Sequence, residues 1–223
     1  MSSVLLLGDS HTHGSYGREL EKLFEAAGWT VTRVGWVGAR ADNYLNGTQE
    51  RIGLGGAGDW NAAKAGRFDV AILTLGTNDA ALLPAGGAAD GAAARLLALS
   101  RTLNAGEVWW VGPPAFEAGI ARTYNKAFAQ DDLNARADRL WRAASPLFSR
   151  TIDPRDATRA FMSSSDIHFG PKGGKAWAKA VYDRVSAVGG TSLSTVSASP
   201  GAGLVLALAG LGVLAWWLWK RRK

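Results

Sequence analysis

The sequence predicts an α/β fold, in which a parallel sheet of about five strands is covered by helices on both faces. Short apolar runs alternate along residues 1–188 with longer stretches in which apolar residues recur at helical spacing. Strands that alternate with helices pair in parallel, and such a sheet is buried on both faces. The chain has 223 residues, 47% of them hydrophobic, which is enough for one such domain and a small additional segment.

Each element is expected from its local pattern. The first strand is continuously apolar and is broken by Gly8, and the third, DVAILTL, carries the clearest strand signal. The strands are expected at residues 4–7, 30–34, 69–75, 107–111 and 147–152. The helices are expected at residues 15–27, 88–104, 122–144 and 171–188, and the glycine-rich residues 46–66 are expected to be loop.

The C-terminal end of the chain has a different composition. Residues 201–219 contain no charge, amide or hydroxyl, and as a helix they would be about 28 Å long, close to the thickness of a bilayer core. Tryptophans gather at the end of this segment, and the basic residues 220–223 follow. We therefore expect a folded domain at 1–188, a Gly/Ser/Thr-rich linker at 189–200, a single transmembrane helix at 201–219 and a basic tail at 220–223.

Composition excludes several classes of function. The chain has no cysteine, which rules out disulfide scaffolds, thiol nucleophiles and iron–sulfur clusters. The net charge of +6 at first suggests a nucleic-acid partner. Removing the four residues of the basic tail from the 25 Lys and Arg leaves 21 against 19 acidic residues, so the rest of the chain is nearly neutral. We therefore expect no nucleic-acid binding, and with only three histidines we expect no metal site.

Polar residues follow the predicted strands where each strand ends. Ser10 follows the first strand, Gly38 the second and Asn78 the third, while Asp166 and His168 lie just before the last helix. The carboxyl ends of parallel strands share one edge of the sheet, where α/β proteins place their sites. Ser10, Gly38 and Asn78 are therefore expected to converge.

These blocks resemble those of the SGNH (GDSL) hydrolases, which are named for a Ser, a Gly, an Asn and a His in four separate blocks. The GDS block matches at Ser10, the second block at Gly38, the GTND block at Asn78 and the last block at His168. The stretch WVGPP at residues 110–114 is also similar to the family. The resemblance covers residues 3–186 and implies a three-layer, flavodoxin-like α/β/α fold with esterase activity and no cofactor.

The resemblance also implies roles in acyl transfer. Ser10 is the implied nucleophile and His168 the base that takes its proton. The implied oxyanion hole comprises the backbone N–H groups of Ser10 and Gly38 and the amide of Asn78. The family places an Asp three residues before the His, but this position is Ser165, and Asp166 is only two residues before His168. Asp166 is the candidate third member, with Ser165, a backbone carbonyl or water as alternatives.

Structural readings of the same residues stay open. Ser10 is also a helix-capping residue type, and Asn78 is a residue type common in turns. Asp9 and Asp79 are expected to be structural. His11 and His13 lie near Ser10, and one of them is a candidate for a substrate contact rather than for direct catalysis.

We expect a membrane-anchored serine esterase that hydrolyses acetyl or short acyl esters, on a carbohydrate or cell-wall glycan. The alternatives are a lipid or thioester hydrolase at the membrane, and a catalytically weak glycan-binding or structural module, including one of a virion. The basic tail favours a catalytic domain outside the cell. The lack of a recognisable signal peptide favours the cytosol, so the side of the membrane stays open, as does the oligomeric state.

Overall fold

The computed structural model describes residues 1–48, 55–117, 132–163 and 166–193. The chain forms two units, residues 1–184 and 185–223. The sheet and the candidate site belong to the first unit.

The sheet has six strands in the order β3-β2-β1-β4-β5-β6. All neighbouring strands are parallel except β3, which runs antiparallel to β2. The bounds are β1 Ser3–Gly8, β2 Thr30–Trp36, β3 Gly56–Ala57, β4 Phe68–Thr74, β5 Ala105–Val111 and β6 Thr151–Ile152. This confirms the predicted α/β class and the parallel pairing.

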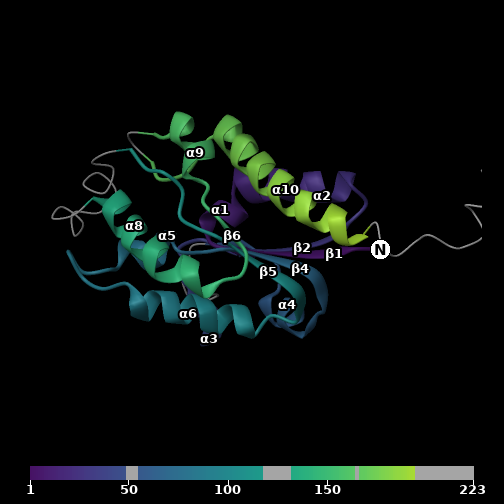
Figure 1. The fold of residues 1–223 in the computed structure, drawn as a ribbon, viewed down its shortest axis with the longest axis horizontal. Coiled ribbons are helices and arrows are strands. Elements are labelled where there is room, and N and C mark those ends of the chain that lie inside the picture. The colour runs from purple at the N-terminus through teal and green to yellow at the C-terminus, as the bar shows by residue number, and fades with distance from the viewer. Residues whose placement is uncertain (49–54, 118–131, 164–165, 194–223) are drawn as a thin grey trace, which may run out of the picture. The chain divides into compact units, whose positions relative to one another are not determined.

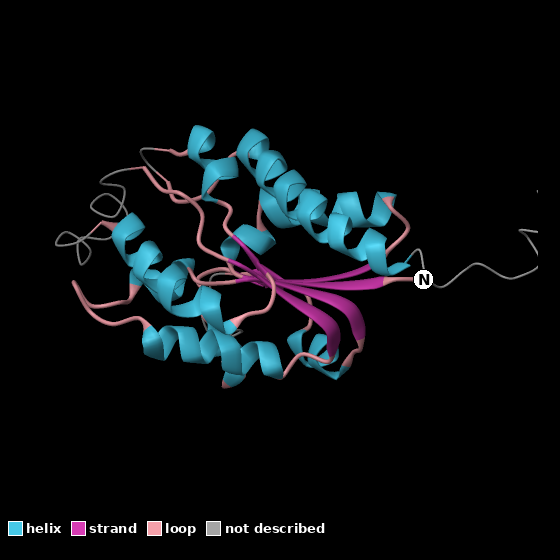
Figure 2. Cartoon of the chain, in the orientation of Figure 1, coloured by secondary structure: helices cyan, strands magenta, loops and turns pink. Residues whose placement is uncertain are grey.

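Helices cover both faces of this sheet (Figures 1 and 2). One face carries α1 (Ser10–His13), α2 (Ser15–Ala26), α9 (Arg155–Thr158) and α10 (Pro171–Leu193). The other face carries α3 (Ala41–Leu45), α4 (Trp60–Ala65), α5 (Thr77–Ala81), α6 (Asp90–Arg101) and α8 (Leu133–Ala144). Two short 3₁₀ turns, η3 (Ser145–Leu147) and η4 (Arg159–Phe161), complete the described elements.

The continuous apolar run of β1 is explained by this layering. Successive side chains of a strand point to opposite faces, so each face needs its own apolar set. Leu5 and Leu7 join the core cluster that also contains Leu96 of α6 and Leu140 of α8. On the other face Tyr16 of α2 stacks on Trp177 of α10, with ring centroids 4.1 Å apart. Trp177, Val181 and Val185, which follow one another at helical spacing on α10, are all buried.

Two expectations for the loop at residues 46–66 were wrong. The described part of this segment contains β3, which brings the strand number above the predicted five, and also α4. The carboxylate of Asp59 caps α4 by accepting a hydrogen bond from the Ala62 N–H at 3.1 Å. Elements of two and six residues are too short to produce a recognisable period, so composition alone suggested a loop.

Other predicted boundaries changed in part. The helix expected at 122–144 is observed as α8 from Leu133 onward, while residues 118–131 lie outside the described residues. Within the strand expected at 147–152, only Thr151–Ile152 pairs with the sheet. Helix α10 runs beyond residue 188 to Leu193, so the first residues of the expected linker are helical.

The predicted membrane span, residues 201–219, lies outside the described residues. Among the helices that the structure does describe, none combines the length and the apolar character needed to cross a bilayer.

Candidate active site

Ser10 lies where β1 ends and α1 begins. The side chain of Asp9 caps α1 by accepting a hydrogen bond from the His11 N–H at 2.9 Å. Ser10 is the first residue of α1, so its own N–H has no acceptor within the helix and is available to another group. Gly8 permits this tight entry, because a Cβ there would lie 2.1 Å from the Thr12 Oγ1. The expected structural role of Asp9 thus has a definite contact.

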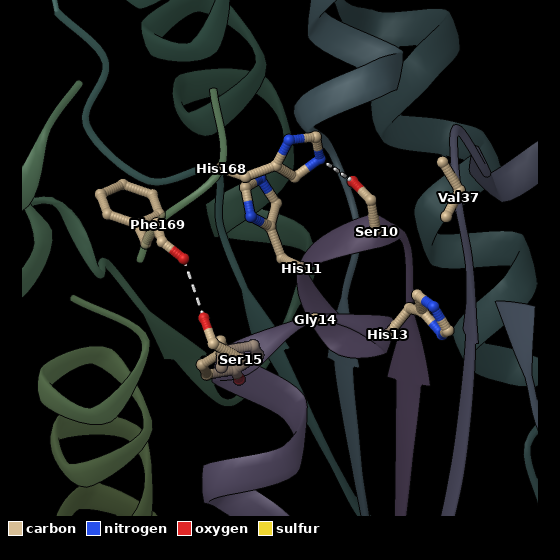
Figure 3. Close-up of a pocket in the computed structure, with 9 residues that line it drawn as sticks. Ser10, His11, His13, Gly14, Ser15, Val37, His168 and Phe169 are labelled. Atoms are coloured by element: carbon tan, nitrogen blue, oxygen red, sulfur yellow. Dashed lines mark hydrogen bonds between the residues drawn. The ribbon is translucent and has the colours of Figure 1, made fainter. Parts of the chain in front are cut away.

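His168 joins Ser10 to Asp166 in a hydrogen-bonded chain (Figure 3). The His168 Nε2 lies 2.8 Å from the Ser10 Oγ, and its Nδ1 lies 2.7 Å from the Asp166 Oδ1. The same carboxylate oxygen accepts the backbone N–H of His168 at 3.0 Å. This local turn, of the kind that Asp side chains form two residues ahead, lets a carboxylate reach the imidazole from the shortened spacing.

The side chains of Asp166 and His168 are both partly open to solvent. The side chain of Asp166 is 53% exposed and that of His168 is 36% exposed. Partial burial raises the pKa of Asp166, but the hydrogen bonds from the backbone and ring of His168 outweigh it, so its pKa lies below the ordinary value. The carboxylate is therefore ionised at neutral pH and accepts from the imidazole.

Aromatic side chains pack behind the His168 ring. The ring centroid of His11 lies 5.4 Å from that of His168 and 5.1 Å from that of Trp177. Burial, and next the charge of His168, lowers the pKa of His11 to about 3, so this imidazole is neutral. The Ser15 hydroxyl donates to the Phe169 carbonyl at 2.9 Å, which joins the start of α2 to the loop of His168. Helices α1, α2 and α10 together hold the imidazole in place.

The other predicted residues lie at the same sheet edge. Gly38 forms the turn after β2 with a φ of +74°, a conformation that favours glycine. The Asn78 amide of α5 donates to the Ala39 carbonyl at 3.1 Å and to the Asp9 Oδ2 at 3.4 Å. Asn78 thus links the loop of Ser10 to the loop of Gly38. Both contacts use its amide nitrogen, which therefore has two hydrogen-bond acceptors.

Two buried carboxyl groups support these loops. Asp79 accepts the Ala41 N–H at 3.4 Å, and its Oδ2 has no hydrogen-bond partner within the described residues. Burial raises the pKa of Asp79 to about 6, and burial together with the nearby Asp79 charge raises the pKa of Asp9 to about 7. Their positions agree with the structural roles expected for both.

A cavity of about 260 Å³ opens beside Ser10. Its lining combines the candidate site with side chains of α1, α2 and the loops after β2 and before α10: Ser10, His11, His13, Gly14, Ser15, Tyr16, Val37, His168 and Phe169. Val37, Ser15 and Phe169 were not singled out from the sequence. Each of them lies close in sequence to a predicted site residue: Val37 precedes Gly38, Ser15 follows the GDS block and Phe169 follows His168. The sequence carries no other signal that would have found them.

The described residues hold no group of three or more His, Asp or Glu side chains arranged to bind a metal ion.

Comparison with known proteins places this fold among esterases and lipases. No family model matches the sequence, and no curated protein matches it either. Solved structures do match: a lipase/acylhydrolase from Enterococcus faecalis has a TM-score of 0.61 at 16% identity, over 84% of this chain and 96% of that one. A carbohydrate acetylesterase family member from Sinorhizobium meliloti has a TM-score of 0.59 at 19% identity, over 83% and 98%.

A GDSL-like lipase from Parabacteroides merdae is similar as well, with a TM-score of 0.59 at 16% identity, over 83% of this chain and 95% of that one. The chain therefore has the fold of the SGNH/GDSL esterases and lipases. At these identities the likeness concerns the fold, and the chemistry depends on the residues described above.

Proposed function

We propose that this protein is a serine ester hydrolase. Ser10 attacks the ester carbonyl, His168 takes its proton and returns it to the leaving alcohol, and Asp166 orients the imidazole. The N–H groups of Ser10 and Gly38 and the amide of Asn78 stabilise the oxyanion. The observation that carries this proposal is the chain from the Ser10 Oγ through both ring nitrogens of His168 to Asp166.

The size of the cavity favours a small substrate. Its volume of about 260 Å³ lies below the range of about 300–1,000 Å³ common for small-molecule pockets, which favours an ester with a small group on the cavity side. Similar folds include the carbohydrate acetylesterase family member and an acetylxylan esterase from Geobacillus stearothermophilus. An acylated carbohydrate or cell-wall glycan is therefore the substrate class that we propose.

We also propose a membrane location. The apolar residues 201–219 would hold the enzyme on a bilayer, and the basic residues 220–223 would end the span. The same segment supports the second candidate function, a lipid or thioester hydrolase, because it would bring the site to substrates in the membrane. A virion membrane is compatible with the same anchor. Protease protection of residues 1–188 in sealed vesicles would distinguish an outward-facing from a cytosolic domain.

The test of the hydrolase uses the full chain and p-nitrophenyl esters of increasing acyl length. Substitution Ser10→Ala should lower kcat by about 10⁴-fold or more, because a triad without its nucleophile retains only binding and oxyanion stabilisation. The control Ser149→Ala changes an exposed serine and should stay within about twofold. A preference for acetyl supports the proposed short acyl group, and a preference for long acyl chains supports the lipid alternative. Equal activity of Ser10→Ala and the unmodified chain would overturn the serine mechanism.

A further inference from the structure

The cavity beside Ser10 has two different walls (Figure 3). His168, His11 and Phe169 lie on one side of Ser10, while His13 and Val37 lie on the other. The first wall belongs to the proposed proton-transfer machinery and its packing. The second wall has no role in the mechanism above, although it carries an imidazole that lines the cavity.

His13 is placed beside the nucleophile by α1. Ser10 and His13 are three residues apart in this helical turn, so their side chains are neighbours on one face, about 5–6 Å apart at Cβ. Both residues line the same cavity, so a substrate bound at Ser10 can also contact the His13 side chain.

The ring nitrogens of His13 differ in their surroundings. Its Nδ1 is buried and has no hydrogen-bond partner within the described residues, whereas Nε2 is not among the buried, unpartnered atoms. Partial burial and the charges of Arg33 and Arg18 lower the pKa of His13, so the imidazole is neutral at pH 7. A buried lone pair costs less than a buried, unpaired N–H, which favours the tautomer that carries its proton on Nε2. His13 can then donate one hydrogen bond.

The part of the substrate in this cavity follows from the mechanism. The leaving oxygen must lie near the His168 Nε2, which returns the proton, and the oxyanion must point toward Gly38 and Asn78. His168 and Ser10 both line the cavity. A leaving oxygen that takes the proton from the His168 Nε2 therefore lies in this cavity, and the alcohol portion of the ester begins there.

We infer that His13 is a specificity-determining residue that donates a hydrogen bond to a hydroxyl group of the alcohol portion, so that the preferred substrates are esters of polyhydroxylated alcohols such as sugars. This inference rests on the proposed esterase function and adds the contact by which a glycan is distinguished from an aryl or alkyl alcohol.

The test compares two acetyl esters on the full chain: a sugar monoacetate, whose alcohol carries free hydroxyls, and p-nitrophenyl acetate, whose alcohol carries none. The measured quantity is the ratio of their kcat/KM values. His13→Leu should lower this ratio by about three- to tenfold, the effect of one hydrogen bond, mainly through the KM of the sugar ester.

Two further variants locate the contact within the ring. The amide nitrogen of Gln reaches the position of the His Nε2, so His13→Gln should keep the ratio within about twofold of the unmodified chain. The shorter His13→Asn should lose it as His13→Leu does. These polar variants also test the contact if the leucine variant does not fold.

The outcomes separate the inference from the proposed function. An unchanged ratio in His13→Leu and His13→Asn, with Ser10→Ala inactive, overturns the inference and leaves the esterase standing. Esterase activity that persists in Ser10→Ala overturns the proposed function and the inference with it. A ratio that falls in the Leu and Asn variants and is kept by Gln supports both.

Discussion

The exposure of Asp166 leads to a quantitative prediction for its removal. In a buried triad the loss of the correct carboxylate costs about 10⁴ in kcat, which corresponds to about 5 kcal/mol. The Asp166 side chain is 53% exposed, so solvent screens its interaction with His168. For two unit charges at the observed 2.7 Å, Coulomb's law gives about 1.5 kcal/mol in water and about 6 kcal/mol at an effective dielectric constant of 20.

A hydrogen bond to a charged group contributes about 1.5–3 kcal/mol net, which lies within those limits. We therefore expect Asp166→Ala to lower kcat by about 10- to 100-fold rather than 10⁴-fold. The packing of His11 behind the imidazole and the contact with Ser10 remain in this variant. Water can reach the vacated position and accept the Nδ1 proton.

The assay is kcat for p-nitrophenyl acetate at saturating substrate, with the full chain. A matched control is Asp183→Ala, because Asp183 is 55% exposed and pairs with Lys179 at 2.6 Å on α10. This control should stay within about twofold. A loss of 10⁴-fold in Asp166→Ala would refute the reasoning from exposure, and a loss below twofold would show that Asp166 does not orient His168.

Two other predictions concern Asn78 and Asp79. Asn78→Ala should lower kcat by about 10²–10³-fold with a smaller change in KM, as expected for an oxyanion donor, and a loss below tenfold with an unchanged melting temperature would exclude that role. Asp79→Asn should alter the pH dependence of stability: because the folded pKa of Asp79 is raised from 3.8 to about 6, the unmodified protein loses stability as pH rises through that window. Urea unfolding measures the free energy of unfolding at each pH. Between pH 4 and pH 8 the variant should gain about 2 kcal/mol in this free energy relative to the unmodified chain. Parallel plots of unfolding free energy against pH for the two proteins would contradict the prediction.

Local sequence patterns identified much of the fold. The apolar run at 4–7 predicted β1, and DVAILTL predicted β4, because a strand buried on both faces must be apolar at every position. The polar residues that follow those strands were correctly expected at one sheet edge, since parallel pairing aligns Gly8 with Gly35 and with Thr74. Helices such as α3 and α5, each of five residues, were missed because they are shorter than two turns.

The amino-acid sequence by itself determined the α/β class and the places where polar residues follow the strands. It also determined the candidate residues Ser10, Gly38, Asn78 and His168. These features depend on the hydrophobic periodicity and the residue types within single segments of the sequence. Only the tertiary structure decided that Asp166 reaches His168 and that Asn78 is held by Asp9 and Ala39. It also decided which side chains enclose the cavity with His13. Those facts depend on hydrogen bonds and packing between segments as far apart as Ser10 and His168, and no local pattern encodes their distances.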